Sequence, residues 1–245
     1  MHLDIEMFFH LFFDLKSVAL LSFHAYWRKI YIPAVNNHLP TVDKMVSLTK
    51  NEARTLAFLV RNFSKNCNIN QLAKLLKISP GGMYKLLKKL SAQGWLVSRE
   101  EGNSSFYNIN YNSQEALDVC KLALSEQEQT SYVKIWVKDL DGLRDKTDLA
   151  ILFGSVLQKG REAQDIDLLL VLEKRNLGKV EQFIQNLNKV KPKKVHAIYQ
   201  TRKDFLKNVE EHDPALLEEV RTGIILWGKD LVIEAIKNEQ DKRQS

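Results

Sequence analysis

The stretch "ILFGSVLQKGREAQDIDLLLVLEK", residues 151–174, decides the fold of the second half of the chain. It contains two apolar runs joined by a polar segment. The first run ends in Gly154-Ser155, and the second begins with two aspartates one residue apart. Short apolar runs bounded by turn-forming residues are typical of buried β-strands. We therefore expect two strands that are connected by a loop at residues 156–164.

The polar residues at the ends of these strands have a pattern that suits nucleotide chemistry. Asp165 and Asp167 are two positions apart, so a strand places both carboxylates on one face, where they can share a hard divalent cation. Gly154 lets backbone amides approach a triphosphate closely, and the Ser155 hydroxyl can bind a phosphate oxygen. Lys159 in the connecting loop can add positive charge beside that phosphate. These residues predict a metal-dependent nucleotide site.

Beyond this stretch, the order strand, loop, strand, helix, strand, helix predicts an α/β unit with a small mixed sheet. The combination of Gly154-Ser155 with Asp165 and Asp167 resembles the minimal nucleotidyltransferases of the DNA polymerase β superfamily. The resemblance covers residues 148–228, including "DPALLEEVRTGIILWG" at residues 213–228 as the closing helix and apolar segment. It implies transfer of NMP from an NTP, expected to be ATP, to an acceptor hydroxyl with Mg²⁺ or Mn²⁺. In that family the equivalents of the two aspartates bind metal, and Gly-Ser holds the phosphates.

One position departs from the family pattern. Active members usually carry a third carboxylate on the following strand, which here is "KKVHAIYQ", residues 193–200, and the expected position is His196. A histidine can ligate a softer metal such as manganese or zinc, or serve as a general base. It can equally mark a domain that binds nucleotide and no longer transfers it. Asp204 and Glu173 are alternative acids, although their spacing favours neither, and enzymatic activity is left open.

Positive charge is concentrated in residues 46–112. This segment has ten basic and three acidic side chains, an excess of seven, whereas the whole chain has a formal net charge of +6. One segment therefore carries the entire excess, as is typical where part of a protein meets a polyanion. The alternative is a basic surface that only contacts solvent.

The same segment has the local signals of three helices and a hairpin. Thr49 and Glu52 form a capping box, Asn70 is the expected cap of a second helix, and Ser79-Pro80 opens a third. The alternating residues 95–100 and 104–111, joined by a tight turn, predict a two-stranded hairpin. This order resembles the winged helix-turn-helix fold of many prokaryotic transcription regulators.

The third helix is the expected contact with double-stranded DNA. Met83, Leu86, Leu87 and Leu90 define its buried stripe, so the opposite face is free to enter the major groove. Glu100 and Glu101 limit the contribution of the hairpin tip. The candidate DNA-binding residues are Ser79, Tyr84, Lys85, Lys88, Lys89 and Arg99. Contact with another protein is the alternative use of this module.

The expected organisation is an N-terminal extension of uncertain status at residues 1–45, a winged helix at 46–112, linker helices at 113–146 and a nucleotidyltransferase-like domain at 147–245. Overall this is an α/β protein of α+β type. The apolar residues 7–23 are too short and too often interrupted by charge to span a membrane. Two cysteines are too few for a disulfide framework. These features predict a cytoplasmic protein, and a homodimer through the linker helices is left open.

Three functions fit these observations. The first is a DNA-binding regulator that also transfers NMP to an unknown acceptor, a protein among them. The second is a transcription regulator whose nucleotidyltransferase-like domain senses a nucleotide without catalysis. The third is an antitoxin-like partner of a helical toxin. His196 favours the second function, whereas the intact Gly-Ser and Asp-x-Asp pattern favours the first.

Overall fold

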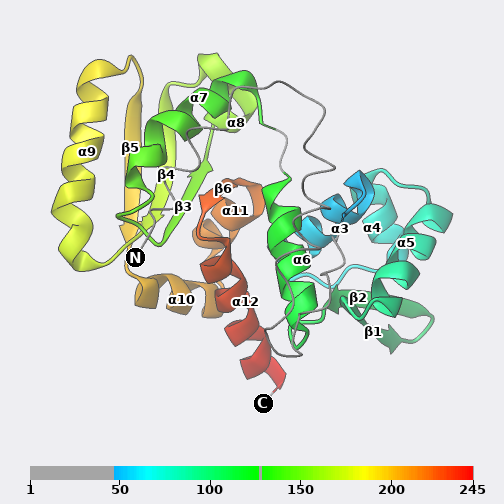
Figure 1. Cartoon of the computed structure of the whole chain (residues 1–245). Coiled ribbons are helices and arrows are strands. Elements are labelled where there is room, and N and C mark those ends of the chain that lie inside the picture. The colour runs from blue at the N-terminus through cyan, green and yellow to red at the C-terminus, as the bar shows by residue number, and fades with distance from the viewer. Residues whose placement is uncertain (1–46, 127–128, 245) are drawn as a thin grey trace, which may run out of the picture. The chain divides into compact units, whose positions relative to one another are not determined.

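The computed structural model describes residues 47–126 and 129–244, all within a structural unit that begins at residue 46 (Figure 1). The extension at residues 1–45 and the apolar segment 7–23 lie outside the described residues. Within the described part, no helix is both long enough and apolar enough to cross a membrane.

The first half of the described chain is a winged helix-turn-helix, as expected from its helix caps. It comprises α3 (Lys50–Arg61), α4 (Ile69–Leu76) and α5 (Pro80–Ala92), followed by β1 (Leu96–Glu101) and β2 (Ser104–Ile109). The capping box at Thr49 and Glu52 is present, and the Ser79 hydroxyl accepts a hydrogen bond from the Gly82 N–H at 3.2 Å. Strands β1 and β2 pair antiparallel from Leu96↔Ile109 to the turn.

The cap of α4 differs from the expectation. Asn68, not Asn70, is the N-cap, because Asn68 keeps an extended backbone and its side chain accepts the Gln71 N–H at 2.9 Å. The Gln71 side chain in turn accepts the Asn68 N–H, completing a capping box that the sequence analysis missed. Asn70 therefore lies inside the first turn of the helix.

The second half contains a mixed sheet of four strands in the order β5-β4-β3-β6. These are β3 (Leu149–Phe153), β4 (Asp165–Val171), β5 (Lys194–Gln200) and β6 (Ile224–Trp227). Strand β3 is antiparallel to both β4 and β6, whereas β4 and β5 are parallel and joined through α9 (Leu177–Val190). The small mixed sheet is thus confirmed.

The connection between β3 and β4 is more ordered than the expected loop. It forms the short helix α8 (Val156–Lys159) and a 3₁₀ turn (Gly160–Glu162). The Lys159 N–H donates to the Ser155 carbonyl at 2.8 Å, and Val156 is fully buried. Burial of this apolar side chain gives the segment a reason to fold back on the sheet instead of remaining in solvent.

Each face of the four-stranded sheet packs against its own hydrophobic cluster. Ile166, Leu168 and Leu170 pack in a cluster with residues of α9 and of α7 (Ser131–Leu140). The alternate residues Leu169 and Val171 belong to the second cluster, together with residues of α10 (Arg202–Glu210), α11 (Pro214–Thr222) and α12 (Lys229–Gln244). Asp165 and Asp167 share the phase of Leu169 along β4, so they lie on the face covered by these last helices.

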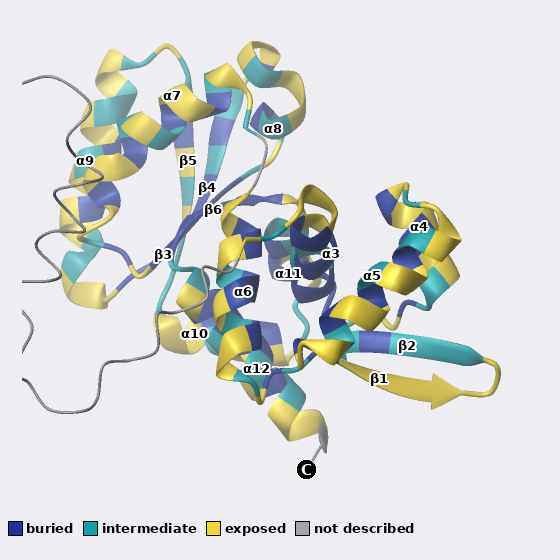
Figure 2. Ribbon diagram, turned by 45° about the vertical axis from the view of Figure 1, so that its right-hand side comes forward, coloured by how far each residue is buried: buried dark blue, intermediate teal, exposed yellow. Residues whose placement is uncertain are grey.

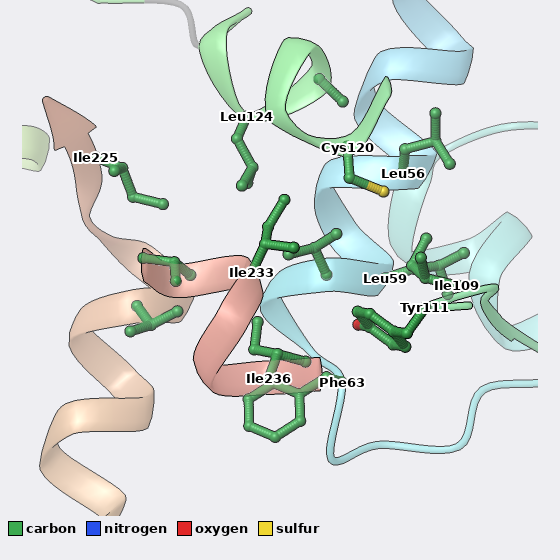
Figure 3. Packing of buried hydrophobic residues seen from close by; sticks show 14 of the residues in the cluster. Leu56, Leu59, Phe63, Ile109, Tyr111, Cys120, Leu124, Ile225, Ile233 and Ile236 are labelled. Carbon is green, nitrogen blue, oxygen red and sulfur yellow. The ribbon is translucent and has the colours of Figure 1, made fainter. Parts of the chain in front are cut away.

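The second cluster continues into the winged helix (Figure 3). Leu56 and Leu59 of α3 pack in it together with Leu124 of α6 (Gln114–Ser125), Ile225 of β6 and Ile233 of α12. Helix α6 packs on α3 and α12. The predicted linker helix is therefore a part of the core, and the winged helix and the sheet share buried apolar surface.

Candidate functional site

The Asp-x-Asp pair and His196 meet at one end of the sheet. In the parallel pairing of β4 with β5, Asp167 lies opposite His196. On the other side of β4, Asp167 lies opposite Phe153, the last residue of β3. Residues from three strands, far apart in the sequence, are thus fixed beside one another by backbone pairing. His196 occupies the place where the family resemblance led us to expect a third carboxylate.

The three side chains are close enough to hold one cation. His196 Nδ1 lies 3.3 Å from Asp165 Oδ2, and one ligand atom from each of Asp165, Asp167 and His196 lies within 4.8 Å of the others. Among the described residues, neither aspartate forms an ion pair with a lysine or arginine. Burial and the neighbouring Asp165 raise the pKa of Asp167. Such uncompensated carboxylates favour a divalent cation.

The position of the Asp167 carboxylate requires a glycine at position 154. Its φ of +79° lies in the left-handed region, and a Cβ placed on it would be 2.0 Å from Asp167 Oδ2. Ser155 follows directly and is partly exposed at the start of α8. The structure therefore brings Gly154 and Ser155 beside Asp167. Lys159 is exposed at the end of α8 and forms no ion pair with either aspartate of the site.

A carboxylate that the sequence analysis did not single out interacts electrostatically with the site. Burial, followed by the charges of Asp213 and Asp167, raises the pKa of Glu219 to about 7. Glu219 lies on α11, which packs against β3. The sequence identified this helix but held no signal for which of its residues faces the aspartates, because that depends on how the helix docks.

The other two candidate acids have local roles elsewhere. The Asp204 carboxylate accepts hydrogen bonds from the Thr201 hydroxyl at 2.6 Å and the Thr201 N–H at 3.3 Å, which caps α10. Glu173 pairs with Arg175 at 2.5 Å. Neither residue belongs to the group formed by the two aspartates and His196.

Four of the six candidate DNA-binding residues lie on α5, and Figure 2 colours this helix by the exposure of its residues. Met83, Leu87 and Leu90 are buried and Leu86 is partly buried, whereas Lys85 and Lys88 are exposed. Tyr84 is 49% exposed, and its ring centroid lies 6.0 Å from Lys88 Nζ. Lys85 and Lys88 have no acidic partner among the described residues, so their charges are available to an external anion.

Two of the predicted cations are partly neutralised within the protein. Lys89 Nζ lies 2.5 Å from the buried Glu52 carboxylate, and Arg99 pairs with Glu101 at 2.6 Å. The first pair joins α5 to α3. Of the lysines and the arginine among the candidate DNA-binding residues, Lys85 and Lys88 are therefore the two without an acidic partner in the described part of the chain.

Arg61 counted toward the basic excess, but it does not lie on the surface. It is buried, and its Nη1 donates to the carbonyls of Val220 and Gly223 at 2.7 Å each and to that of Arg221 at 3.3 Å. The guanidinium of α3 thus binds the C-terminal end of α11. The basic surface is correspondingly smaller than the composition indicated.

The three helices and hairpin define a winged helix-turn-helix domain, followed by an α/β part with an Asp-Asp-His group. Residues 46–104, which include the three helices and the first strand of the hairpin, match the family model described as MarR family. The match ends before the sheet begins. The nucleotidyltransferase interpretation therefore rests on the Gly-Ser and Asp-x-Asp pattern and on the geometry of the site.

Solved structures of two proteins are similar to part of the chain. A mutant of Lactococcus lactis ZitR is 22% identical, covering 54% of this chain and 88% of its own, with a TM-score of 0.30. Staphylococcus aureus MepR, a transcription regulator of a multidrug efflux pump, is 13% identical, covering 40% and 79%, with a TM-score of 0.29. TM-scores this low carry no functional argument. No curated protein matches the chain.

Proposed function

We propose that the protein is a DNA-binding transcription regulator of MarR type whose α/β part binds a nucleotide together with a divalent cation. The observation that carries the first half is the face of α5. Lys85, Lys88 and Tyr84 are exposed together on the helix that enters the major groove in a helix-turn-helix, in a segment that matches the MarR family.

The energetics of such an interface are dominated by phosphate contacts. Each lysine that neutralises a phosphate releases condensed counterions, so binding weakens as salt rises. Tyr84 and the Ser79 hydroxyl can add hydrogen bonds to the DNA backbone or to base edges. Because Lys89 and Arg99 have internal partners, we expect them to contribute less than Lys85 and Lys88.

Replacing Lys85 and Lys88 together with alanine is expected to weaken duplex binding by about tenfold or more at low salt, with the slope of log affinity against log salt reduced by about 2. The measurement is fluorescence anisotropy with a labelled duplex over a range of salt concentrations. The matched control replaces Lys179 and Lys189, two exposed lysines of α9, and removes the same charge away from α5. Equal losses in both double variants, or no loss in either, would remove α5 from the interface.

A second function, nucleotidyl transfer, is favoured by the position of Gly154 and Ser155 beside Asp167. Asp165 and Asp167 would hold the cation, and Ser155 would bind a phosphate oxygen of the NTP. The cation, when bound, supplies charge that stabilises the phosphoryl oxygens. The acceptor hydroxyl oxygen would bond to the α-phosphorus as the bond to pyrophosphate breaks. The hydroxyl proton would pass to His196 where its imidazole is not bound to the cation, and otherwise to solvent water. The antitoxin interpretation has no support from the described contacts.

Transfer is tested with α-labelled ATP, Mg²⁺ or Mn²⁺, and the protein itself, duplex DNA and host lysate as acceptors. We expect Asp167→Asn to lower labelling by about 100-fold or more, because the cation loses one of its two carboxylates. Asp148→Asn, at an exposed position before β3, is the matched control. ATP binding without label in the wild type would leave the sensor alternative in place. Absence of both binding and label would reject a nucleotide site.

A further inference from the structure

We infer that Asp165, Asp167 and His196 bind a late first-row transition-metal dication, of the Zn²⁺ or Co²⁺ class, in preference to Mg²⁺. The inference builds on the cation site proposed above and concerns the choice of metal. Two carboxylates come from β4 and an imidazole from the neighbouring β5, and their ligand atoms all lie within 4.8 Å of one another.

The donor set distinguishes between the two classes of cation. Mg²⁺ prefers six oxygen ligands in near-octahedral geometry and keeps several waters. An imidazole nitrogen instead suits zinc and the later first-row metals, whose affinity for mixed nitrogen and oxygen sites rises along the series from manganese to copper. Three protein ligands also leave one or more positions open, the arrangement of catalytic and substrate-binding zinc sites. An aspartate at position 196 would make all three protein ligands oxygen atoms. The residue at this one position therefore decides which class of cation the site prefers.

Contacts within the described part of the chain give the His196 side chain no structural role. The side chain is 63% exposed, so it contributes little to the core. It lies 3.3 Å from Asp165, which is itself a member of the group. The register of β4 with β5 fixes its backbone opposite Asp167, so little conformational freedom has to be lost when a cation binds. Two carboxylates and a neutral imidazole also match the charge of a dication.

The test is isothermal titration of the full chain with Zn²⁺ and, separately, with Mg²⁺, without nucleotide or DNA. The wild type is expected to bind Zn²⁺ at least about 100-fold more tightly than Mg²⁺, and His196→Ala to weaken Zn²⁺ binding by about tenfold or more. His196→Asp is the discriminating variant. It should improve Mg²⁺ binding and narrow the ratio of the two affinities by at least about tenfold.

The control is His212→Gln, which removes the other histidine of the described residues. His212 pairs with Glu239 outside the site, so the ratio of affinities should stay at the wild-type value. The same Zn²⁺ to Mg²⁺ ratio in wild type, His196→Ala and His196→Asp, all shown folded by circular dichroism, would overturn the inference. Because the titration contains no nucleotide or DNA, its outcome is independent of whether the protein transfers NMP or binds a duplex.

Discussion

Replacement of Arg61 with methionine is expected to lower the free energy of unfolding by about 3 kcal/mol. The guanidinium donates to three carbonyls in the last turn of α11 and at Gly223, two of them at 2.7 Å. Methionine fills a similar volume but donates no hydrogen bond. The substitution therefore removes the hydrogen bonds that Arg61 makes to these carbonyls, and that loss at a buried position is the main source of the destabilisation.

Two further effects bear on the size of the loss. The Arg61 guanidinium lies at the C-terminal end of α11, where a positive charge is favoured by the helix dipole. Burial lowers the pKa of Arg61 to about 10, which still leaves it charged at neutral pH. Burying that charge has its own cost, which methionine removes, so the net loss is smaller than the sum of the hydrogen bonds.

Arg54 provides the matched control on the same helix. Its Nη2 donates to the single carbonyl of Leu76 at 2.8 Å, and the residue is exposed. We expect Arg54→Met to cost under about 1 kcal/mol, because solvent can replace this partner. Both variants are compared by urea unfolding followed by circular dichroism. If the two losses are equal, the carbonyls of α11 do not depend on Arg61.

The location of Arg61 matters for function as well as stability. Gly223, which accepts from Arg61, packs against Ile151 and Leu152 of β3, just before Gly154. The same helix α11 carries Glu219, which responds electrostatically to Asp167. The first helix of the winged helix is thus bonded to the element that adjoins the cation site. This gives the two proposed functions a physical connection through one buried side chain.

Local signals explain why so much of the fold could be predicted from the sequence. The caps at Thr49 and Ser79 are side-chain to backbone contacts within one helical turn, so their residues are neighbours in the sequence. The alternation of β4 likewise places Asp165 and Asp167 on one face without reference to the rest of the chain. The position of His196 opposite Asp167 could be anticipated only from the family pattern, and the strand register agrees with it.

Apart from the local capping box at Asn68 and Gln71, the missed features depend on how distant segments dock. The partners of Arg61 are about 160 residues away in the sequence, with separations of 159 to 162, and Lys89 of α5 meets Glu52 of α3, 37 residues earlier. In each case the residue type predicted an exposed charge, and packing gave it an internal partner. Glu219 is the converse, an acid on an amphipathic helix whose electrostatic interaction with Asp167 depends on docking. No spacing rule along the chain encodes these relations.

Replacement of Gly154 with alanine is expected to disable the cation site as well as to lower stability. At φ +79° an alanine is strained by about 1–2 kcal/mol. Its Cβ would also lie 2.0 Å from Asp167 Oδ2 and 2.9 Å from Asp167 Cγ, so the carboxylate must rotate away. Because the cation needs both aspartates on one face, we expect its affinity to fall by about tenfold or more.

Gly94→Ala is the control that separates the backbone strain of a positive φ from the steric clash with the Asp167 carboxylate. Gly94 has nearly the same φ, +75°, but an added Cβ would meet no atom within 4 Å. Both variants should lose similar stability in urea unfolding, whereas only Gly154→Ala should lose cation binding in a Zn²⁺ titration. Retained binding in Gly154→Ala would mean that Asp167 can move and still ligate, and the glycine would then serve the backbone turn alone. Loss of binding in Gly154→Ala alone would tie the Gly-Ser turn directly to the position of the second carboxylate.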